Sequence, residues 1–221
     1  MIAVVVLVGC ASVSTEQKAI VEKAIRKSLK KPKGKLTKAD VGKVTVLGFK
    51  GTKINDAGLK EVAKLQQLNK LDLSISKITD AGLKEVAKLK QLNHLTLTFT
   101  PITDAGLKEV AKLEKLTRLT LNGTQITDEG LRQVAKLQQL TYLGLDSTQI
   151  TDEGLKEVGK LPQLSWLNLY KTKVSDAGLK EVAKMKQLKV LGLVDNKITK
   201  AGVAHLKKAL PKCIILSIPK K

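Results

Sequence analysis

The chain has 221 residues and a formal net charge of +20, because 40 Lys and Arg residues face only 20 Asp and Glu residues. Two cysteines provide no disulfide framework. The sequence contains no Cys-x-x-Cys, no His-Glu-x-x-His, no GxxxxGK[ST] phosphate loop and no GxGxxG fingerprint, and its two histidines are far apart. We therefore expect no metal site, no cofactor and no enzymatic activity.

Residues 1–10 contain an apolar run from Ile2 to Val8, which is too short to span a bilayer. Leu7-Val8-Gly9-Cys10 resembles the lipobox of bacterial lipoproteins, in which the cysteine is acylated and becomes the mature N-terminus. The resemblance implies a signal that ends at Cys10 and a lipid anchor in the bacterial cell envelope. If Cys10 is unmodified, the alternative is a cytoplasmic protein.

Residues 13–43 are predicted to be helical. Ser14-Thr15-Glu16-Gln17 is typical of a capping box, and apolar residues from Ile20 to Leu29 follow with helical spacing. Lys31-Pro32-Lys33-Gly34 ends this helix, and a short second turn is expected from Leu36 to Val41.

One unit recurs every 24 residues over residues 44–198. In residues 68–91, Leu71 and Leu73 alternate with polar residues as in a strand, and Leu83, Val86 and Leu89 follow with helical spacing. Neither element can bury its apolar side alone, so the units must stack into a solenoid. Parallel strands are predicted near residues 44–49, 68–73, 92–97, 116–121, 140–145, 164–169 and 188–193.

The pattern LxxLxLxxTxITDAGLKEVAKLxQ resembles the leucine-rich repeats of bacterial proteins. The resemblance implies a right-handed α/β solenoid with parallel strands on the concave face and helices on the convex face. Residues 13–43 resemble the helical N-terminal cap of internalin-like proteins. Residues 199–221 are interpreted as a C-terminal helix and a closing strand, in which Cys213 takes a leucine position and is expected to be buried.

Three polar positions of the repeat are interpreted as structural. A small hydroxyl or amide residue such as Thr100 can satisfy backbone groups in a buried turn. The glycine of each unit, for example Gly106, allows close approach of neighbouring units. The aspartate of each unit, for example Asp104, suits a helix N-terminus.

The lysines recur at two helix positions, exemplified by Lys84 and Lys88, with glutamates such as Glu85 between them. This arrangement predicts a mixed, solvated convex face. The alternative is a polyanion-binding surface, although nucleic-acid binding is not expected.

The candidate binding site lies in the outward columns of the strands. Equal repeat positions should lie side by side, about 4.8 Å apart. The only Trp and both Tyr residues fall in these columns within two adjacent repeats, and Gly144 is expected to leave room there for a ring or a ligand. The predicted site residues are Tyr142, Trp166, Tyr170, Arg118, His94, Asp146 and Asn168.

Exposed aromatic residues on a rigid face are typical interface anchors, and aromatic packing on the sheet is the alternative. Ser74, His94 and Asp72 could be arranged as a catalytic triad, but an open sheet offers no oxyanion hole and no enclosing cleft. The sequence therefore predicts a non-enzymatic protein of the bacterial envelope that binds a protein or a glycan on its concave face. A cytosolic interaction scaffold and a polyanion-binding protein remain the alternatives.

Overall fold

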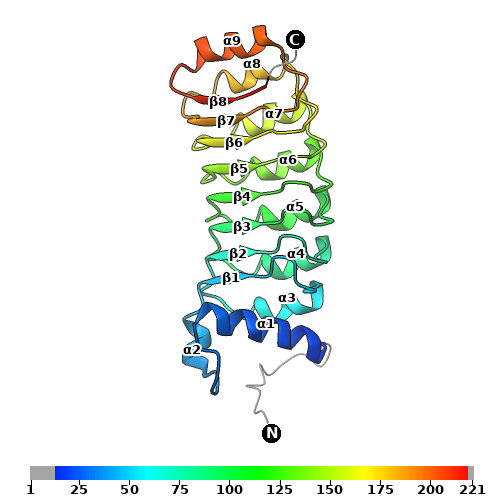
Figure 1. Ribbon diagram of the computed structural model, residues 1–221, viewed down its shortest axis with the longest axis vertical. Coiled ribbons are helices and arrows are strands. Elements are labelled where there is room, and N and C mark those ends of the chain that lie inside the picture. The colour runs from blue at the N-terminus through cyan, green and yellow to red at the C-terminus, as the bar shows by residue number, and fades with distance from the viewer. Residues whose placement is uncertain (1–12, 219–221) are drawn as a thin grey trace.

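The computed structural model describes residues 13–218, and within them eight parallel strands form one open sheet in sequential order (Figure 1). The strands are Val46–Gly48 (β1), Lys70–Asp72 (β2), His94–Thr96 (β3), Arg118–Thr120 (β4), Tyr142–Gly144 (β5), Trp166–Asn168 (β6), Val190–Gly192 (β7) and Ile214–Leu216 (β8). The helices are Thr15–Ser28 (α1), Lys38–Gly42 (α2), Asp56–Val62 (α3), Asp80–Val86 (α4), Asp104–Val110 (α5), Asp128–Val134 (α6), Asp152–Val158 (α7), Leu179–Val182 (α8) and Lys200–Ala209 (α9).

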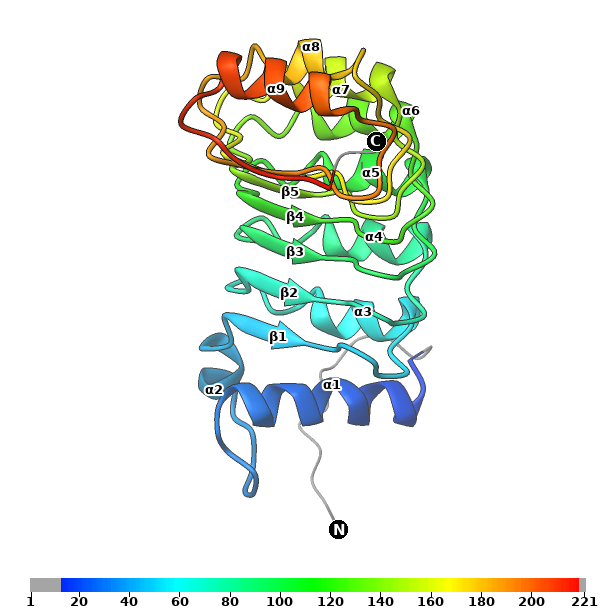
Figure 2. The ribbon, with the colours of Figure 1, turned by 45° about the horizontal axis from the view of Figure 1, so that its top comes forward.

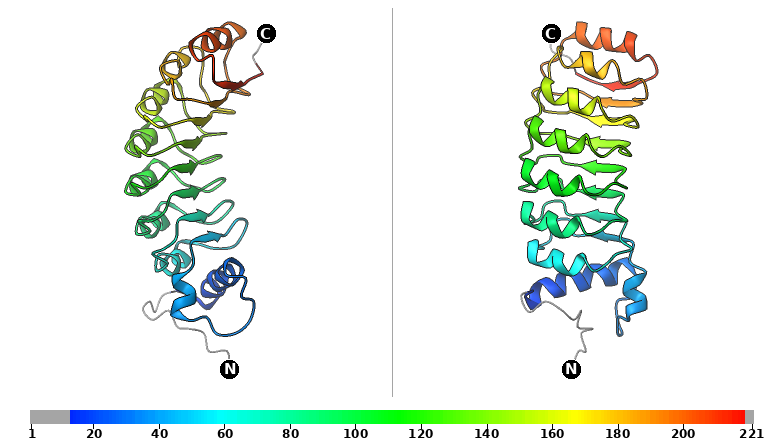
Figure 3. Two further views of the ribbon diagram at one scale, coloured as in Figure 1. Left: turned by 90° about the vertical axis from the view of Figure 1, so that its left-hand side faces the viewer. Right: turned by 180° about the vertical axis from the view of Figure 1, so that it is seen from behind.

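The molecule is a curved right-handed solenoid with the strands on its inner face and the helices on its outer face (Figure 3). Equal repeat positions are paired, so Leu71 lies beside Leu95 and Leu95 beside Leu119. The predicted parallel strands and their 24-residue register are therefore confirmed. Each regular strand is only three residues long, but the pairing continues beyond it, as in the bond from Leu73 N–H to the Thr96 carbonyl.

A single apolar core runs through the solenoid. The repeating leucines and the aliphatic anchor of each turn, such as Ile78 and Ile102, are fully buried. The small polar residue is buried in every turn after the first, where Thr52 is partly exposed, and the Thr100 hydroxyl donates to the Leu97 carbonyl at 2.6 Å. This bond confirms that the small polar column satisfies backbone groups in the turns.

The aspartate of each repeat binds the next repeat. Asp80 Oδ1 accepts from the Thr103 backbone N–H at 2.9 Å, and Asp80 Oδ2 accepts from the Thr103 hydroxyl at 2.6 Å. The helix cap is the residue before the aspartate, since the Thr79 side chain accepts from Ala81 N–H. The same two bonds join Asp56 to Thr79, Asp104 to Thr127, Asp128 to Thr151, Asp152 to Ser175 and Asp176 to Thr199.

The helix glycine makes room for this carboxylate. A Cβ atom on Gly106 would overlap Asp80 Oδ1 and come within 2.8 Å of Leu83 Cδ1. The glycine is therefore required by the close approach of neighbouring repeats, as predicted. The aspartate, expected to act at a helix N-terminus, acts mainly between repeats.

Helix α1 lies across the first repeat, beside β1 and α3 (Figure 2). Val21 and Ile25 are buried in the same core as the repeats. Gln17 occupies the place of the missing aspartate, because its Oε1 accepts from Asn55 N–H and its Nε2 donates to the Lys53 carbonyl, both at 3.1 Å.

The predicted capping box at Ser14 is therefore only half formed. The Ser14 hydroxyl accepts from Gln17 N–H, but the Gln17 side chain is engaged with the first repeat. A reciprocal capping box is found at α2 instead, between Thr37 and Asp40. Hydrogen bonds from Lys31 and from Thr37 hold the pKa of the Asp40 carboxyl well below its usual range.

The last strand leaves Cys213 half-buried, which corrects the prediction that this cysteine is buried. The reason is its position directly before β8, which is the edge of the sheet and has no further repeat beside it. Partial burial still raises the pKa of the Cys213 thiol. Cys10, the predicted lipidation site, lies outside the described residues.

Candidate functional site

Three of the predicted site residues form a continuous stack across the concave face. Strand pairing places Arg118 beside Tyr142 and Tyr142 beside Trp166. The two rings stack with centroids 4.1 Å apart and planes inclined by 10°. The Arg118 guanidinium carbon lies 4.0 Å from the Tyr142 ring centroid, which is a cation–π contact. We call Arg118, Tyr142 and Trp166 the aromatic stack.

The rings of the aromatic stack are half-buried. Tyr142 lies between Arg118 and Trp166, so its burial raises the pKa of its phenol, while the nearby guanidinium charge partly opposes this shift. Contacts of this kind fix the orientation of the rings before any ligand arrives. A preorganised aromatic surface loses less conformational entropy on binding.

Tyr170, Asn168 and Asp146 lie around the C-terminal end of the aromatic stack. The Tyr170 ring covers Gly192, where an added Cβ would overlap ring carbon Cε1. Asn168 Oδ1 accepts from Tyr170 N–H at 3.0 Å, and Asp146 Oδ1 accepts from the Ser147 hydroxyl at 2.9 Å. These bonds fix Asn168 and Asp146 where β6 and β5 end.

The expected space above Gly144 is filled, which corrects the prediction that this glycine leaves room for a ligand. A Cβ atom on Gly144 would lie 2.8 Å from Asn122 Oδ1 and 3.1 Å from Thr120 Cγ2. Asn122 is held there because its Oδ1 accepts from Asp146 N–H at 3.0 Å. A ligand would therefore meet the aromatic stack itself, not a hollow beside it.

His94 precedes Arg118 in the same column. Its Nδ1 lies 2.6 Å from Asn93 Oδ1. Partial burial, with the positive charges of Lys70 and Arg118 on the neighbouring strands, lowers the pKa of His94. Ser74 donates its hydroxyl hydrogen bond to Asp72, so Ser74, His94 and Asp72 are not connected as a catalytic triad.

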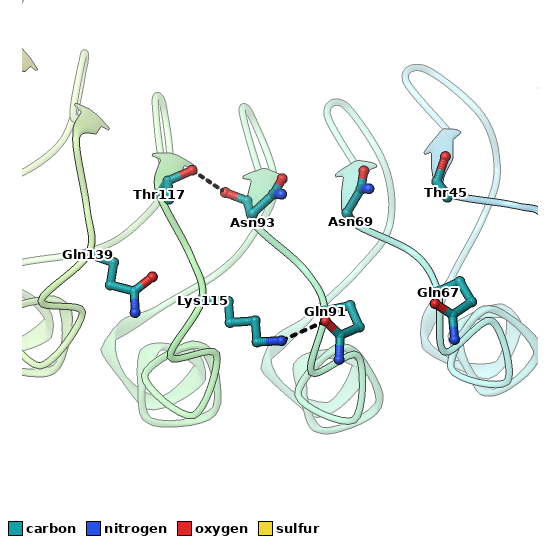
Figure 4. Close-up of a pocket in the computed structure, with 8 residues that line it drawn as sticks. All are labelled: Thr45, Gln67, Asn69, Gln91, Asn93, Lys115, Thr117 and Gln139. Atoms are coloured by element: carbon teal, nitrogen blue, oxygen red, sulfur yellow. Dashed lines mark hydrogen bonds between the residues drawn. The ribbon is translucent and has the colours of Figure 1, made fainter.

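A polar groove that the sequence analysis did not identify runs along the edge where the chain enters the strands (Figure 4). It has a volume of about 530 Å³. Lys115 Nζ donates to Gln91 Oε1 at 2.7 Å, and Thr117 Oγ1 donates to the Asn93 carbonyl at 3.1 Å. The repeated Gln and Asn positions could have revealed it. Its lining residues are Thr45, Gln67, Asn69, Gln91, Asn93, Lys115, Thr117 and Gln139.

The convex face carries alternating charges, as predicted. Lysines such as Lys88 pair with a glutamate three residues earlier, here Glu85 at 2.7 Å. Further pairs of this kind join Lys112 to Glu109, Lys160 to Glu157 and Lys184 to Glu181. In the first repeat the partner Glu61 is buried, because α1 covers it.

Within residues 13–218, no group of three or more histidine, cysteine or carboxylate side chains is arranged to hold a metal ion. Over the same range, no helix has both the length and the apolar character needed to cross a membrane.

Comparisons with known proteins agree with the observed architecture. A family model described as Leucine Rich repeat matches residues 64–87, 112–135 and 136–159. A search of curated proteins gives no match.

Two solved bacterial structures resemble most of the chain. Internalin C2 from Listeria monocytogenes is 26% identical with a TM-score of 0.73, over 91% of this chain and 85% of that chain. A leucine-rich-repeat protein of Leptospira interrogans is 26% identical with a TM-score of 0.58, over 80% of this chain and 49% of that one, so the match spans about half of the Leptospira protein. The three matched repeats, the parallel sheet and these two structures together show that the chain contains leucine-rich repeats and has the leucine-rich-repeat solenoid fold, and that both similar structures are bacterial.

Proposed function

We propose that this protein is a non-enzymatic binding protein that holds a protein or glycan partner against the concave face of its solenoid. The observation that carries the proposal is the aromatic stack of Arg118, Tyr142 and Trp166 on three adjacent strands. The repeat itself does not need aromatic residues here, because the equivalent positions hold Lys70 in one repeat and Val190 in another.

The chemistry of the stack suits both classes of partner. A ring edge beside a guanidinium can anchor a peptide side chain, and an indole face can stack on a sugar ring. Asp146, Asn168 and the Tyr170 hydroxyl add polar groups that can fix the orientation of the ligand. His94 extends the column on the other side of Arg118.

We further propose that the protein acts in the bacterial cell envelope and is held there by lipid on Cys10. The Leu7-Val8-Gly9-Cys10 motif and the likeness to internalin C2 support this placement. Mass spectrometry of the native protein should find acylated Cys10 and no residues 1–9. An unmodified Cys10 in the soluble fraction would favour the cytosolic scaffold instead.

The binding proposal is tested with Trp166→Ala in a quantitative pull-down from bacterial envelope extract. The variant should weaken partner binding by about 2 kcal/mol or more, as expected for an interface hot spot. Loss of the ring stack should reduce the free energy of unfolding by only about 0.5–1.5 kcal/mol. Trp166→Phe keeps a ring over Tyr142 and therefore separates the effect on partner binding from the effect on the free energy of unfolding.

Lys84→Ala and Lys108→Ala on the convex face are the matched controls and should bind normally. If Trp166→Ala binds normally but unfolds much more readily, the aromatic stack is packing and the concave-face proposal fails. If the two lysine variants reduce binding instead, and the loss follows the salt dependence of ion pairing, the convex face binds a polyanion.

A further inference from the structure

Each repeat from β1 to β7 places one residue in the left-handed region of backbone conformation, three residues after the end of its strand. In the first six of these repeats the backbone N–H of this residue donates to a carbonyl of the following repeat, as in Ile75 N–H to the Thr98 carbonyl and Phe99 N–H to the Asn122 carbonyl, both at 2.8 Å. The fold therefore imposes this conformation whatever the side chain. The residues are Gly51, Ile75, Phe99, Gly123, Ser147, Lys171 and Asp195, with φ between 48° and 68°.

Two of these residues are unsuited to the position. Glycine adopts positive φ freely, and asparagine and aspartate tolerate it. Ile75, at φ 53°, and Phe99, at φ 52°, carry a β-branched and a bulky side chain. Such residues rarely adopt positive φ, and backbone strain of this kind is concentrated at functional sites.

The same two side chains are exposed to solvent. Ile75 is 50% exposed and Phe99 is 59% exposed, and strand register places them side by side in adjacent repeats. The Phe99 ring lies against Gly123, where an added Cβ would overlap ring carbon Cδ1. Neither the core nor the turn requires these apolar groups, which project from backbone positions that the bonds between repeats define.

Positive charge surrounds the two apolar side chains. Lys50 precedes the equivalent turn residue Gly51, and Lys53 and Lys77 follow in the same two turns. All three lysines are exposed, and none forms an ion pair within residues 13–218. The carboxylate of Asp72, at the end of β2, accepts hydrogen bonds from the backbone N–H and the hydroxyl of Ser74.

We propose that Ile75 and Phe99, together with Lys50, Lys53 and Lys77, form a docking site for an acidic segment of a partner protein that carries apolar side chains. Carboxylates of the segment would pair with the lysines while its apolar residues cover Ile75 and Phe99. A membrane surface would also meet the polar turns at Ser147 and Asp195, whereas a peptide segment can confine itself to these two turns.

This docking site is separate from the aromatic stack. The apolar turns follow β2 and β3, whereas the stack lies on β4, β5 and β6. Failure of the concave-face proposal in the Trp166→Ala experiment would therefore leave this inference untouched, and the converse also holds.

The test uses random 12-residue peptides displayed on phage and selected against the full-length protein. Affinities of the enriched synthetic peptides are then measured by calorimetry for the wild type and for Ile75→Asn/Phe99→Asn. Asparagine tolerates the left-handed conformation, so this variant retains the fold. The matched control, Ser147→Asn/Lys171→Asn, changes the equivalent turn position of two later repeats.

The enriched peptides should combine acidic and apolar residues. They should bind at least tenfold more weakly to Ile75→Asn/Phe99→Asn and to Lys50→Glu/Lys53→Glu/Lys77→Glu, and should bind the control as they bind the wild type. Enrichment of peptides without this composition, or equal affinity for the wild type and the Ile75/Phe99 variant, would overturn the proposal. Binding of phosphatidylserine vesicles that depends on Ile75 and Phe99, without peptide enrichment, would overturn it in favour of a membrane surface.

Discussion

The helix glycine of each repeat leaves space for a carboxylate from the preceding repeat. Its conformation is an ordinary helical one, so its role depends on the absence of a side chain and not on backbone freedom. Gly106→Ala would push the new methyl group against Asp80 and Leu83. We expect this substitution to reduce the free energy of unfolding by about 1–3 kcal/mol, measured by urea denaturation.

Gly159 provides the matched comparison. It ends α7 at φ −58°, where the equivalent position of other repeats is alanine, for example Ala87 and Ala111. A Cβ atom there would meet the Leu155 carbonyl at 3.4 Å, an ordinary contact. Gly159→Ala should therefore stabilise the protein by about 0.5–1 kcal/mol, because it restricts the unfolded chain. Equal effects of the two substitutions would show that the space beside the Asp80 carboxylate is not essential.

His94 should make stability depend on pH in a defined window. Burial and the charges of Lys70 and Arg118 lower the pKa of folded His94 below its ordinary value of 6.5. The unfolded chain therefore binds this proton first as the pH falls, so the free energy of unfolding should decrease from about pH 6.5 down to the lowered pKa of the folded state. Above that window the imidazole is neutral in both states and contributes no difference.

His94→Gln should remove this component. The measurement is the free energy of unfolding at pH 7.5 and at pH 5.5, a range above the ordinary titration of carboxylates. The wild type should lose more stability over this interval than His94→Gln does. An identical loss in both proteins would mean that the environment of His94 does not disfavour its charged form.

At the scale of the elements, the side-chain hydrogen bonds that connect one repeat to the next also attach the N-terminal helix α1 to the first repeat. We call each such connection a joint. Each joint consists of an aspartate carboxylate that bridges to a hydroxyl and an N–H of the next repeat, and Gln17 of α1 supplies the first joint with an amide. At the other end of the described residues, Lys200 occupies the aspartate position at the start of α9. The helix that precedes the repeats is thus connected to them by the same kind of bond that connects the repeats to one another.

Gln17→Ala tests this joint. The side chain is 4% exposed, and its removal leaves Asn55 N–H and the Lys53 carbonyl without their partner. We expect a loss of about 1–3 kcal/mol in the free energy of unfolding, the usual penalty for buried groups left unsatisfied. Lys23→Ala, an exposed position on the same helix, should change stability by less than about 0.5 kcal/mol. If Gln17→Ala leaves the free energy of unfolding unchanged, the packing of Val21 and Ile25 alone attaches α1 to the repeats.

The strands and helices could be predicted from the sequence because their apolar spacing is local and repeats every 24 residues. The joints could not be predicted in this way. Asp80 and Thr103 are 23 residues apart, and the preference of aspartate for helix N-termini already explained Asp80 locally. Gln17 was assigned to a capping box for the same reason, although its partners lie in the first repeat.

At the scale of the whole molecule, the 24-residue register alone predicts that Arg118, Tyr142 and Trp166 lie next to one another, because equal repeat positions pair in parallel strands. Ring orientation and side-chain placement do not follow from register. Register could therefore not predict that the Asn122 side chain fills the space above Gly144. The exposed Ile75 and Phe99 lie in turns, where neither strand alternation nor helical spacing applies, so the sequence pattern gave no signal for them.

The positive charge is also a property of the whole molecule. With a formal net charge of +20, the positive side chains repel one another, and this repulsion is stronger in the compact folded state than in the unfolded chain. The lysines of the convex face differ in how they are compensated. Lys84, Lys108 and Lys180 form no ion pair within residues 13–218, whereas Lys88, Lys112 and Lys184, just after the same helices, are paired with glutamates.

Lys84→Gln/Lys108→Gln/Lys180→Gln should therefore raise the melting temperature at low salt. The gain should shrink as salt increases, because the screening length falls from about 30 Å at 0.01 M to about 8 Å at 0.15 M. The control Lys88→Gln/Lys112→Gln/Lys184→Gln removes the same number of charges but also removes three pairings, so it should gain less or lose stability. Differential scanning calorimetry of both variants across this salt range makes the comparison. If removal of Lys84, Lys108 and Lys180 gives no gain in melting temperature at low salt, charge repulsion does not destabilise the folded protein at these positions. The regular spacing of these lysines along the convex face would then carry no detectable energetic cost, and polyanion binding would not be needed to explain why they are kept.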